Sequence, residues 1–246
     1  MNPPRVSDGT YIDFLIGTPK VASACEAARV HPDTPAAPAH DAFSRLLARL
    51  EPDSETLRKG VRPHGGRAGG IPIADDTVPD KPYAHETGLV GRFRSGEHRR
   101  VVRGIDPVTL AWGDGDAVYP VDYRLVDPAE APGRNKNEHV RRMLATAKGR
   151  GFPPHYVCFD AWYSGKDNPK AVRTHGWHFL TRVRSDRPVD LDRTGNKPVS
   201  EQPVAATGTV VHVEGFGLVK AFRIVAPNGD TGTGSPTTWI GTTSPA

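Results

Sequence analysis

The stretch 71-IPIADDTVPDKPY-83 decides which fold the sequence predicts. Ile71 and Ile73 alternate with other residues as in a half-buried β-strand, and Asp75 and Asp76 follow directly. Aspartate is depleted in strands. The acidic pair therefore has two interpretations: a polar strand end stopped by turn residues, or a strand that presents a carboxylate to a ligand.

Composition sets limits for the whole chain. Its 246 residues include 24 Pro and 26 Gly, 37% are hydrophobic, and the formal net charge is +4. This length suits one sizeable core or two modest ones, and a mildly basic balance permits a polyanionic partner without proving one. Basic residues cluster in 92-RFRSGEHRRVVR-103 and 134-RNKNEHVRR-142. Each cluster is either a solvated face or a phosphate-binding surface.

The two cysteines, Cys25 and Cys158, are far apart and have no metal-ligand spacing, which indicates a reducing compartment. The N-terminus has no apolar segment of the kind found in signal peptides, and no apolar run reaches the roughly 18 residues of a membrane span. The sequence therefore predicts a soluble, cytoplasmic protein.

Residues 1–60 are predicted to form a small helical N-terminal region. The segment 41-DAFSRLLARLE-51 places four apolar residues on one helical face: Phe43, Leu46, Leu47 and Leu50. Asp41 is the expected N-cap, and an earlier helix is expected over 20–30. Two short helices joined by a turn suit either a plain helical hairpin or a DNA-reading unit. A Gly-rich linker is expected over 61–70.

Residues 71–185 are predicted to form an α/β core. The expected elements are strands at 71–77, 101–112 (bent at Asp106-Pro107) and 117–126, a helix at 136–151, a strand at 156–160, a helix at 166–176 and a strand at 177–184. Right-handed crossovers lay the later strands in the same sheet. This order predicts a ribonuclease H-like mixed sheet with flanking helices. A β insertion is expected over 186–230, with a hairpin at 208–225 that turns at Gly215 and Gly217.

In such a sheet the first strand lies beside the fourth. Asp75 ends the first strand, and Asp160 closes the fourth directly after 156-YVCF-159. Two adjacent carboxylates repel unless one is protonated or a cation lies between them. Mg²⁺ favours one or two carboxylates together with water and phosphate oxygens. The pair therefore indicates metal-dependent phosphodiester chemistry.

Five stretches, taken together, resemble the DDE-superfamily transposases of bacterial insertion sequences that have a ribonuclease H-like core and a β insertion. They are 73-IADDTVPDKPY-83, 88-GLVGRFRSGEHRRVVRGIDPVTLAWGDGDAVYPVDYRL-125, 158-CFDAWYSG-165, 177-WHFLTRVR-184 and 208-GTVVHVEGFG-217. The resemblance runs from about Tyr11 to Asp230. It implies Mg²⁺- or Mn²⁺-dependent cleavage and strand transfer at insertion-sequence ends. The implied partners are the terminal repeats, target DNA and a second copy of the chain in a homodimer.

The resemblance also assigns roles to residues. The family pattern of Asp, any residue, then Ser or Thr selects Asp75 as the first catalytic and metal-binding acid, with Asp76 as the alternative. Asp160 would be the second. The candidate DNA-binding residues are Lys81, Arg99, Arg100, Arg103, Arg182 and Arg184. Trp162 and Tyr163 would be substrate-side aromatics, with packing as the alternative.

The chain departs from the family after Asp230. The family's third catalytic carboxylate is a Glu on a helix after the β insertion, whereas 231-TGTGSPTTWIGTTSPA-246 contains no acid, no base and no helical period. This composition predicts a disordered, aberrant tail of the kind produced by a lost reading frame. Loss of a ligand carboxylate should cost more than the about 10–100-fold that supporting residues contribute, so we expect a truncated, inactive relative. The alternatives are a non-catalytic DNA-binding remnant and a stand-alone metal-dependent phosphodiesterase or nuclease.

Overall fold

The computed structural model describes residues 4–19, 22–50, 53–61, 69–129, 135–224 and 237–242. It divides into two compact units, Met1–Asp53 and Ser54–Ala246. The described residues of the first unit form four helical elements: α1 (Asp8–Gly17), α2 (Ala24–Arg29), η1 (Thr34–Ala36) and α3 (His40–Arg49). Within the described ranges, no helix is both long and apolar enough to cross a membrane.

A small apolar core holds the first unit together. Its buried members are Val6, Ala27, Ala42, Phe43 and Leu46. The predicted apolar face of α3 is confirmed only in part, because Leu47 is 48% exposed. The N-cap prediction is wrong: Ala39 is the N-cap, and Asp41 lies in the first turn, where it forms an ion pair with Arg45. A negative side chain in this turn also complements the helix dipole.

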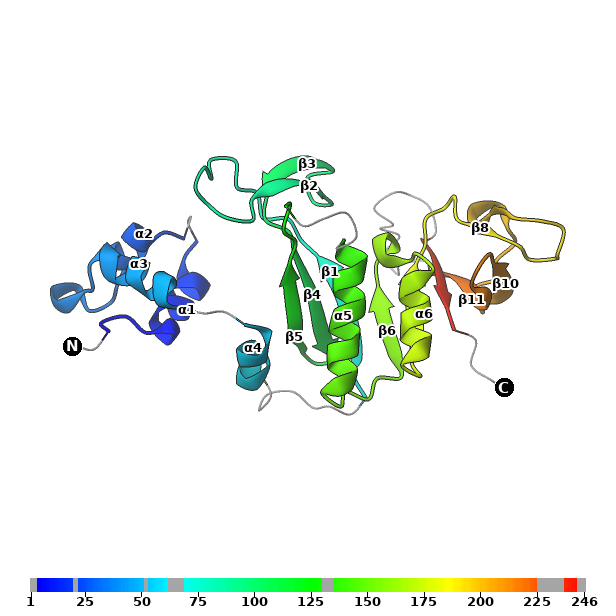
Figure 1. The fold of residues 1–246 in the computed structure, drawn as a ribbon, viewed down its shortest axis with the longest axis horizontal. Coiled ribbons are helices and arrows are strands. Elements are labelled where there is room, and N and C mark those ends of the chain that lie inside the picture. The colour runs from blue at the N-terminus through cyan, green and yellow to red at the C-terminus, as the bar shows by residue number, and fades with distance from the viewer. Residues whose placement is uncertain are drawn as a thin grey trace. The chain divides into compact units, whose positions relative to one another are not determined.

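Eight strands of the second unit form one mixed sheet in the order β10-β11-β12-β7-β6-β1-β4-β5 (Figure 1). Five of them form its core: β1 (Ile71–Asp76), β4 (Pro107–Gly113), β5 (Val118–Leu125), β6 (Tyr156–Phe159) and β7 (His178–Arg182). Strand β1 pairs antiparallel with β4 and parallel with β6, and β6 pairs parallel with β7. The predicted ribonuclease H-like order is confirmed.

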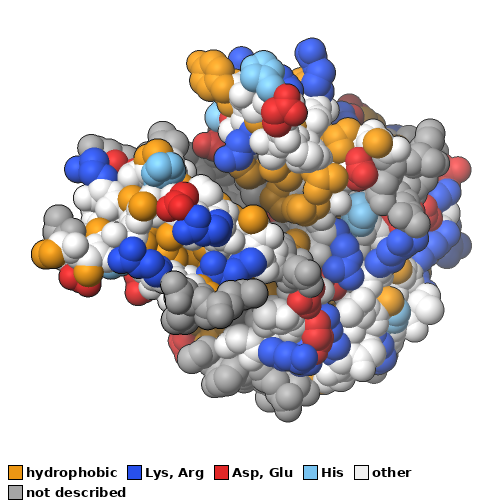
Figure 2. All heavy atoms as spheres, turned by 60° about the vertical axis from the view of Figure 1, so that its left-hand side comes forward, with side chains coloured by type: hydrophobic (Ala, Val, Ile, Leu, Met, Phe, Trp, Pro, Cys, Tyr) orange, Lys and Arg blue, Asp and Glu red, His pale blue; other side chains and the backbone are white. Residues whose placement is uncertain are grey.

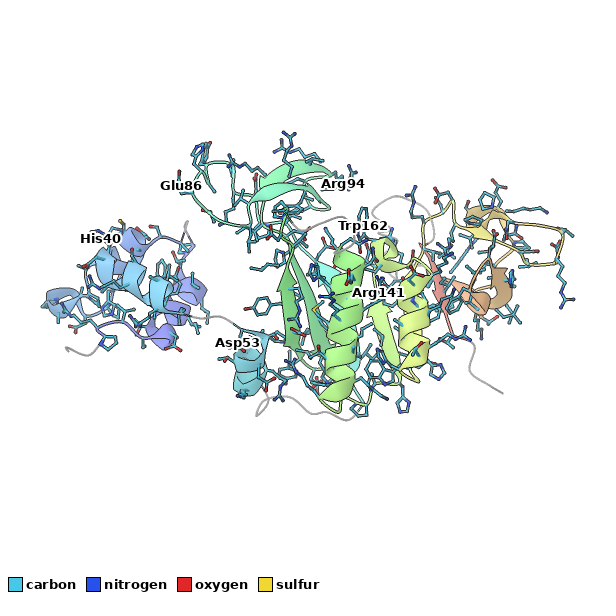
Figure 3. All side chains as sticks on the ribbon, viewed as in Figure 1. His40, Asp53, Glu86, Arg94, Arg141 and Trp162 are labelled. Carbon is cyan, nitrogen blue, oxygen red and sulfur yellow. The ribbon has the colours of Figure 1, made fainter. Side chains whose placement is uncertain are left out.

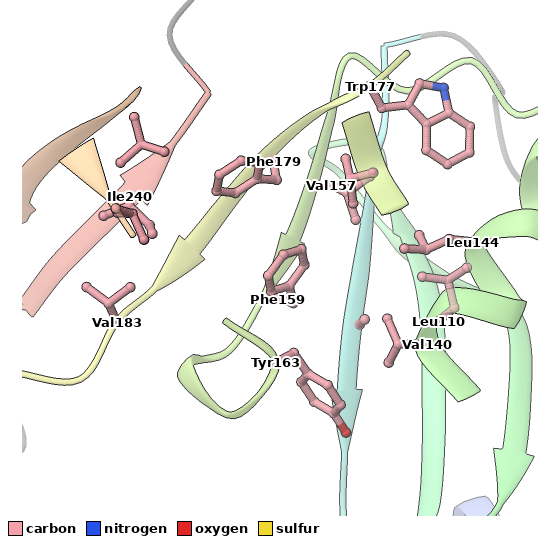
Figure 4. Close-up of a cluster of buried hydrophobic side chains, with 14 of the residues drawn as sticks. Leu110, Val140, Leu144, Val157, Phe159, Tyr163, Trp177, Phe179, Val183 and Ile240 are labelled. Carbon is pink, nitrogen blue, oxygen red and sulfur yellow. The ribbon is translucent and has the colours of Figure 1, made fainter. Parts of the chain in front are cut away.

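The helices α5 (Lys136–Gly149) and α6 (Asp167–Thr174) make the two crossovers and cover the same face of the sheet (Figure 1). The amphipathic pattern explains why α5 lies there. Its apolar residues Val140, Met143, Leu144 and Ala147 are all buried, as the sequence predicts. They join Leu110, Val157, Phe159 and Phe179 of the strands in one core (Figure 4). Burial of each large apolar side chain contributes about 1.5–3 kcal/mol to stability.

The expected strand 101–112 is wrong, because it is two strands in different sheets. Strand β3 (Arg100–Gly104) pairs with β2 (Gly91–Ser95) in a separate hairpin, and β4 begins at Pro107. A Cβ on Gly104 would lie 2.4 Å from the carbonyl oxygen of Pro79, so only glycine allows the two segments to pass here. The residue before a proline avoids helical geometry and favours an extended one. The hairpin therefore leaves the sheet between the end of β1 and the start of β4.

The predicted β insertion contains two small pairings. Strands β8 (Pro188–Val189) and β9 (Lys197–Pro198) form one, followed by η3 (Val199–Glu201). Strands β10 (Thr209–Val213) and β11 (Gly217–Ile224) form the hairpin that the sequence predicts. Gly215 and Gly217 have φ angles of +71° and +108°, the left-handed region that favours glycine. The hairpin extends the main sheet rather than standing apart from it.

The prediction of a disordered tail over 231–246 is wrong for its central part. Thr237–Gly241 form strand β12, which lies between β7 and β11 and is antiparallel to both. Thr238 and Ile240 are buried on the core side. Threonine, tryptophan and isoleucine favour a pleated, half-buried surface, so a short alternating segment forms a strand once a sheet edge is present. Residues 231–236 and 243–246 lie outside the described ranges.

The expected unit boundary near residue 60 also differs from the structure. Helix α4 (Ser54–Val61) belongs to the second unit, because its side chains reach β5 and the end of α5. Arg124 donates a hydrogen bond to Ser54 at 3.4 Å, and Arg150 lies 3.1 Å from Glu55. Residues 62–68 of the expected linker lie outside the described ranges.

Glu55→Gln should remove an acid-sensitive contribution to stability. A hydrogen bond from Arg58, with the charges of Arg58, Arg150 and Lys59, lowers the pKa of Glu55 to about 2. A carboxyl whose pKa is lowered on folding stabilises the native state above its unfolded value and loses that effect as pH falls through its folded value. Urea denaturation at about pH 6 should therefore show E55Q to be less stable than wild type, and the difference should shrink toward pH 2. An equal loss in Glu138→Gln, whose partner Arg142 is in the same helix, would contradict a specific role for the contact between Glu55 of α4 and Arg150 at the end of α5.

Candidate active site

The ends of β1 and β6 bring Asp75 beside Asp160. The parallel register pairs Ile73 with Cys158 and Ala74 with Phe159, so its next step aligns Asp75 with Asp160. Paired residues on neighbouring strands point to the same face of a sheet. Ala74 and Phe159 point into the core, where they are 1% and 3% exposed. The two carboxylates therefore lie on the opposite face, and both residues are exposed.

The electrostatics of Asp75 agree with this placement. Partial burial is the largest cause that raises the pKa of Asp75, and the negative charges of Asp76 and Asp160 raise it further. The backbone N–H of Asp76, which donates to Asp75 Oδ1 at 2.9 Å, and the charge of Lys136 act in the opposite direction. Asp75 and Asp160 are thus close enough to repel, and a bound cation would relieve that repulsion.

Asp76 points to the other side of β1 and has partners inside the protein. Its Oδ2 accepts a hydrogen bond from Lys136 Nζ at 2.7 Å, and its Oδ1 accepts one from the Tyr163 hydroxyl at 2.5 Å. Lys136 Nζ also lies 2.8 Å from Oδ2 of Asp106, a fully buried residue. Because both oxygens of Asp76 are engaged, Asp75 is the acid of this pair that remains accessible to a ligand.

The charge states within this cluster follow from its hydrogen bonds. Burial alone would lower the pKa of Lys136, but its bonds to Asp106 and Asp76 outweigh that effect and raise it. Burial raises the pKa of Asp106, and Lys136 opposes the rise. Burial and the hydrogen bond to Asp76 both raise the pKa of Tyr163, so its hydroxyl stays protonated and donates. The ammonium group of Lys136 is therefore the cation shared by two carboxylates.

The two candidate aromatic residues have different surroundings. Tyr163, in η2 (Ala161–Tyr163), is fully buried and directs its hydroxyl toward β1 (Figure 4), so the packing alternative holds for it. Trp162 is 60% exposed, near the first turn of α5 (Figure 3). Lys136 Nζ lies 5.7 Å from the centre of the Trp162 ring, within the range of a cation–π contact.

A row of side chains continues from the acid pair across the sheet. Phe159 pairs with Thr181, so the next step of the register aligns Asp160 with Arg182, and Trp239 of β12 pairs with Arg182. Arg182 is exposed on the same face as the carboxylates. Arg184 instead forms an exposed ion pair with Asp186 at 2.9 Å. Sequence reasoning missed Trp239, because it placed this residue in a disordered tail.

The other predicted basic residues lie on or beside the β2–β3 hairpin. Arg99 is at its turn, Arg100 and Arg103 are on β3, and Lys81 donates its backbone N–H to the Arg103 carbonyl at 2.7 Å. All four are exposed. The hairpin is formed by the next two strands after the acid-bearing end of β1 (Figure 1). These residues and the acid pair are therefore at the same end of the sheet.

Three arginines share one exposed face of this hairpin, which we call the arginine face: Arg92, Arg94 and Arg103. The register sets Arg92 opposite Arg103, and Arg94 opposite Val101. Figure 3 labels Arg94 on β2, and Figure 2 shows Lys and Arg side chains on the segment that projects at the top of the view. Like charges directly opposite each other destabilise a hairpin. A bound polyanion would offset that cost. The alternation of Arg92 and Arg94 was the signal that sequence reasoning overlooked.

The donor set at the acid pair suits a hard cation. In the part of the chain that the structure describes, no group of three or more His, Cys, Asp or Glu side chains is placed to hold a metal ion. The site therefore offers two carboxylates, Asp75 and Asp160. Mg²⁺ binds through one or two carboxylates with water and phosphate oxygens, whereas a structural zinc site needs four protein ligands. The pair fits Mg²⁺ or Mn²⁺.

A ribonuclease H-like sheet with two acids at the ends of adjacent parallel strands defines a nuclease-type class of site. The sequence matches the family of DDE superfamily endonucleases over residues 11–205. This chain belongs to that family, which confirms the expected superfamily. No curated protein sequence matches the chain.

Several solved structures are similar to this chain at low sequence identity. The piggyBac transposase synaptic complex with hairpin DNA has a TM-score of 0.48 and 11% identity, over 99% of this chain and 48% of that one. The Drosophila P element transposase strand transfer complex has a TM-score of 0.41 and 9% identity, over 79% and 48%. Ciona intestinalis Endonuclease V with inosine-containing DNA has a TM-score of 0.34 and 9% identity, over 81% of each chain. The chain spans about half the length of the two transposases.

Proposed function

We propose that this chain carries the core of a transposase of the kind that cleaves and rejoins DNA at the ends of a bacterial insertion sequence, and that its activity is weak or lost because the described residues lack a third catalytic carboxylate at the site. The observation that supports this most directly is the parallel register of β1 and β6, which pairs Ala74 with Phe159 and whose next step sets Asp75 beside Asp160. Membership in the DDE superfamily endonucleases supports DNA as the substrate. Asp75 and Asp160 are the proposed catalytic and metal-binding acids. Asp76, the alternative, is engaged by Lys136 and Tyr163 instead.

Each residue of the site has a separate task in this proposal. Asp75 and Asp160 would hold Mg²⁺ or Mn²⁺, which when bound stabilises charge on the attacking and leaving oxygens of a phosphodiester. Arg182, the next residue in the row, would contact a non-bridging phosphate oxygen, since guanidinium groups bind phosphate with strong charge-assisted hydrogen bonds. Trp162 is exposed in η2, the turn that follows Asp160, where its ring can pack against the nucleotide.

The remaining basic residues would bind the DNA backbone away from the scissile bond. The arginine face, together with Lys81, Arg99 and Arg100, supplies a positive surface at the acid-bearing end of the sheet. Phosphate contacts of this kind fix register and orientation without reading sequence. Terminal-repeat recognition must then come from other residues, for which the helical first unit is the proposed source. Cleavage of two element ends would require two copies of the chain, a homodimer.

Alanine at Arg92, Arg94 and Arg103 together should weaken DNA binding and reduce its salt dependence. Each lost phosphate contact lowers the slope of log K against log salt by about 0.9, so three contacts lower it by between 2 and 3. Fluorescence anisotropy of a labelled short duplex at several KCl concentrations measures both quantities. The matched control removes three positive charges from the helices, at Arg142, Lys148 and Lys170, and should leave the slope nearly unchanged. Equal effects of the two triple variants would contradict a specific role for the arginine face.

Nicking of supercoiled plasmid in Mn²⁺ buffer, with an EDTA control, tests the proposed function. We expect weak nicking and little strand transfer, because the described residues supply two carboxylates at the site, whereas the resemblance to DDE transposases implies three. Even weak nicking must disappear in Asp75→Asn. DNA binding without any metal binding at the acid pair would favour the non-catalytic DNA-binding remnant. Salt-insensitive hydrolysis of small phosphate esters would favour a stand-alone phosphodiesterase.

A further inference from the structure

We propose that Lys136 is a positioning residue that fixes the spacing between Asp75 and Asp160 without contacting a ligand itself. The inference rests on the proposed function, because it concerns the same acid pair. Lys136 is the first residue of α5 and only 16% exposed at its side chain. A lysine at the start of a helix normally extends into solvent. The low exposure of Lys136 is therefore explained by its contacts with Asp76 and Asp106.

Lys136 joins the ends of two adjacent strands. Its Nζ lies 2.7 Å from Asp76 Oδ2, at the end of β1, and 2.8 Å from Asp106 Oδ2, directly before β4. Asp76 is the chain neighbour of Asp75, and its N–H donates to Asp75 Oδ1. A shift of Asp76 toward or away from α5 therefore moves the Asp75 carboxylate with it.

The same Asp76 carboxylate is also tied to the turn that carries Asp160. Tyr163 donates its hydroxyl to Asp76 Oδ1, and its backbone N–H to the Asp160 carbonyl at 2.9 Å. Asp76 is thus the point at which the strand of Asp75 and the turn of Asp160 are joined. Lys136 holds this point against α5 through the second carboxylate oxygen.

A buried asparagine closes the cluster from behind. Asn168, 1% exposed in α6, donates one hydrogen bond to the Tyr163 carbonyl at 3.0 Å and one to Asn137 Oδ1 at 2.7 Å. Asn137 follows Lys136 in α5, so the contacts form a ring that returns to its start. Arg141 donates to Asn168 Oδ1 at 3.1 Å. The amide of Asn168 is therefore fixed by three partners, and η2 has little freedom to move.

Stability alone does not explain this cluster. Two carboxylates share one ammonium group: Asp106 is fully buried, and the Asp76 side chain is 16% exposed. Taking such charges out of water costs more than their attraction returns unless the geometry is tightly fixed. Apolar residues of similar volume would stabilise the same position at least as well. Sites that act on a ligand need their binding groups held by surrounding hydrogen bonds. Placement of the acid pair is the role that the cluster serves.

Lys136→Met tests the inference through Mn²⁺ affinity rather than activity. The dissociation constant, measured from free Mn²⁺ by electron paramagnetic resonance, should rise by about 10–100-fold, the effect of residues that orient metal ligands. Lys148→Met is the matched control: Lys148 is also on α5 and also lies over an aromatic ring, that of Trp177 at 5.3 Å, but it does not touch the acids. Its Mn²⁺ affinity should equal that of wild type. Lys136→Arg keeps a cation for both carboxylates and should restore much of the loss.

Tyr163→Phe gives a second measurement that changes no charge, and it decides the question if Lys136→Met does not fold. It should also weaken Mn²⁺ binding, by less than Lys136→Met does. Circular dichroism must show each variant folded at the temperature of the titration. Wild-type affinity in both Lys136→Met and Tyr163→Phe, with binding lost in Asp75→Asn, would overturn the inference and leave the proposed function standing. No Mn²⁺ binding by wild type would overturn both.

Discussion

Asparagine at Asp75 or at Asp160 should raise the dissociation constant for Mn²⁺ by more than about 100-fold, because a ligand carboxylate contributes more than the residues that orient it. Each substitution keeps the shape of the side chain and removes its charge. The same variants should lose any metal-dependent nicking of DNA. Asp116→Asn is the matched control, since Asp116 is an exposed acid in the turn between β4 and β5.

Although Asp75→Asn should lose Mn²⁺ affinity, its metal-free stability should not fall. This difference distinguishes loss of a metal ligand from loss of the fold. The pKa of Asp75 is raised in the folded protein, first by burial and then by Asp76 and Asp160. A carboxyl with a raised folded pKa stabilises the native state below its unfolded pKa and opposes folding once pH exceeds its folded value. At neutral pH and without metal, Asp75→Asn should therefore melt at or above the wild-type temperature.

Mn²⁺ should then raise the melting temperature of wild type and leave that of Asp75→Asn unchanged, because a ligand stabilises only the state that binds it. Calorimetric melting curves with and without Mn²⁺ measure both effects. A wild-type Mn²⁺ affinity in both single variants would mean that the acid pair is only a polar strand end. Lower metal-free stability of Asp75→Asn would show instead that the carboxylate has a structural task.

The sequence predicted the fold well where chain order alone determines the result. Alternating apolar residues and the two amphipathic helices sufficed for the order of the five core strands, and hence for Asp75 beside Asp160. It failed at 101–112, where the bend expected at Asp106-Pro107 is a complete break between strands of two different sheets. That break depends on the contact between Gly104 and Pro79, which is a tertiary feature.

Other parts of the site depend on tertiary contacts that no local pattern contains. Lys136 stands at the start of a helix, where a lysine usually faces water, and only the fold brings Asp76 and Asp106 to it. The choice between Asp75 and Asp76 was open in the sequence because adjacent strand residues alternate between faces. Register with β6 sets Asp75 on the face of Asp160, and Asp76 contacts Lys136 on the other side of the strand. Trp239 was missed because the composition of segment 231–246 was judged without the neighbouring strands that β12 pairs with.

Ile240→Ala should lower the free energy of unfolding by about 2–5 kcal/mol, the range for truncating a large apolar side chain in a core. Ile240 is 2% exposed and pairs with Thr181 of β7 on one side and Ala221 of β11 on the other. The loss of stability combines the transfer free energy of the removed carbon atoms with the free-energy cost of the cavity that they leave. Urea denaturation monitored by circular dichroism measures it.

The control for this variant is Leu218→Ala on the neighbouring strand β11. Leu218 is 63% exposed, and a surface substitution of this kind should change stability by less than about 0.5 kcal/mol. If the segment around Ile240 were disordered, both variants would unfold at the wild-type midpoint. A large effect confined to Ile240→Ala would mean that β12 joins the insertion hairpin to β7. The strand that pairs with Arg182 would then be built by the very segment whose composition predicts disorder.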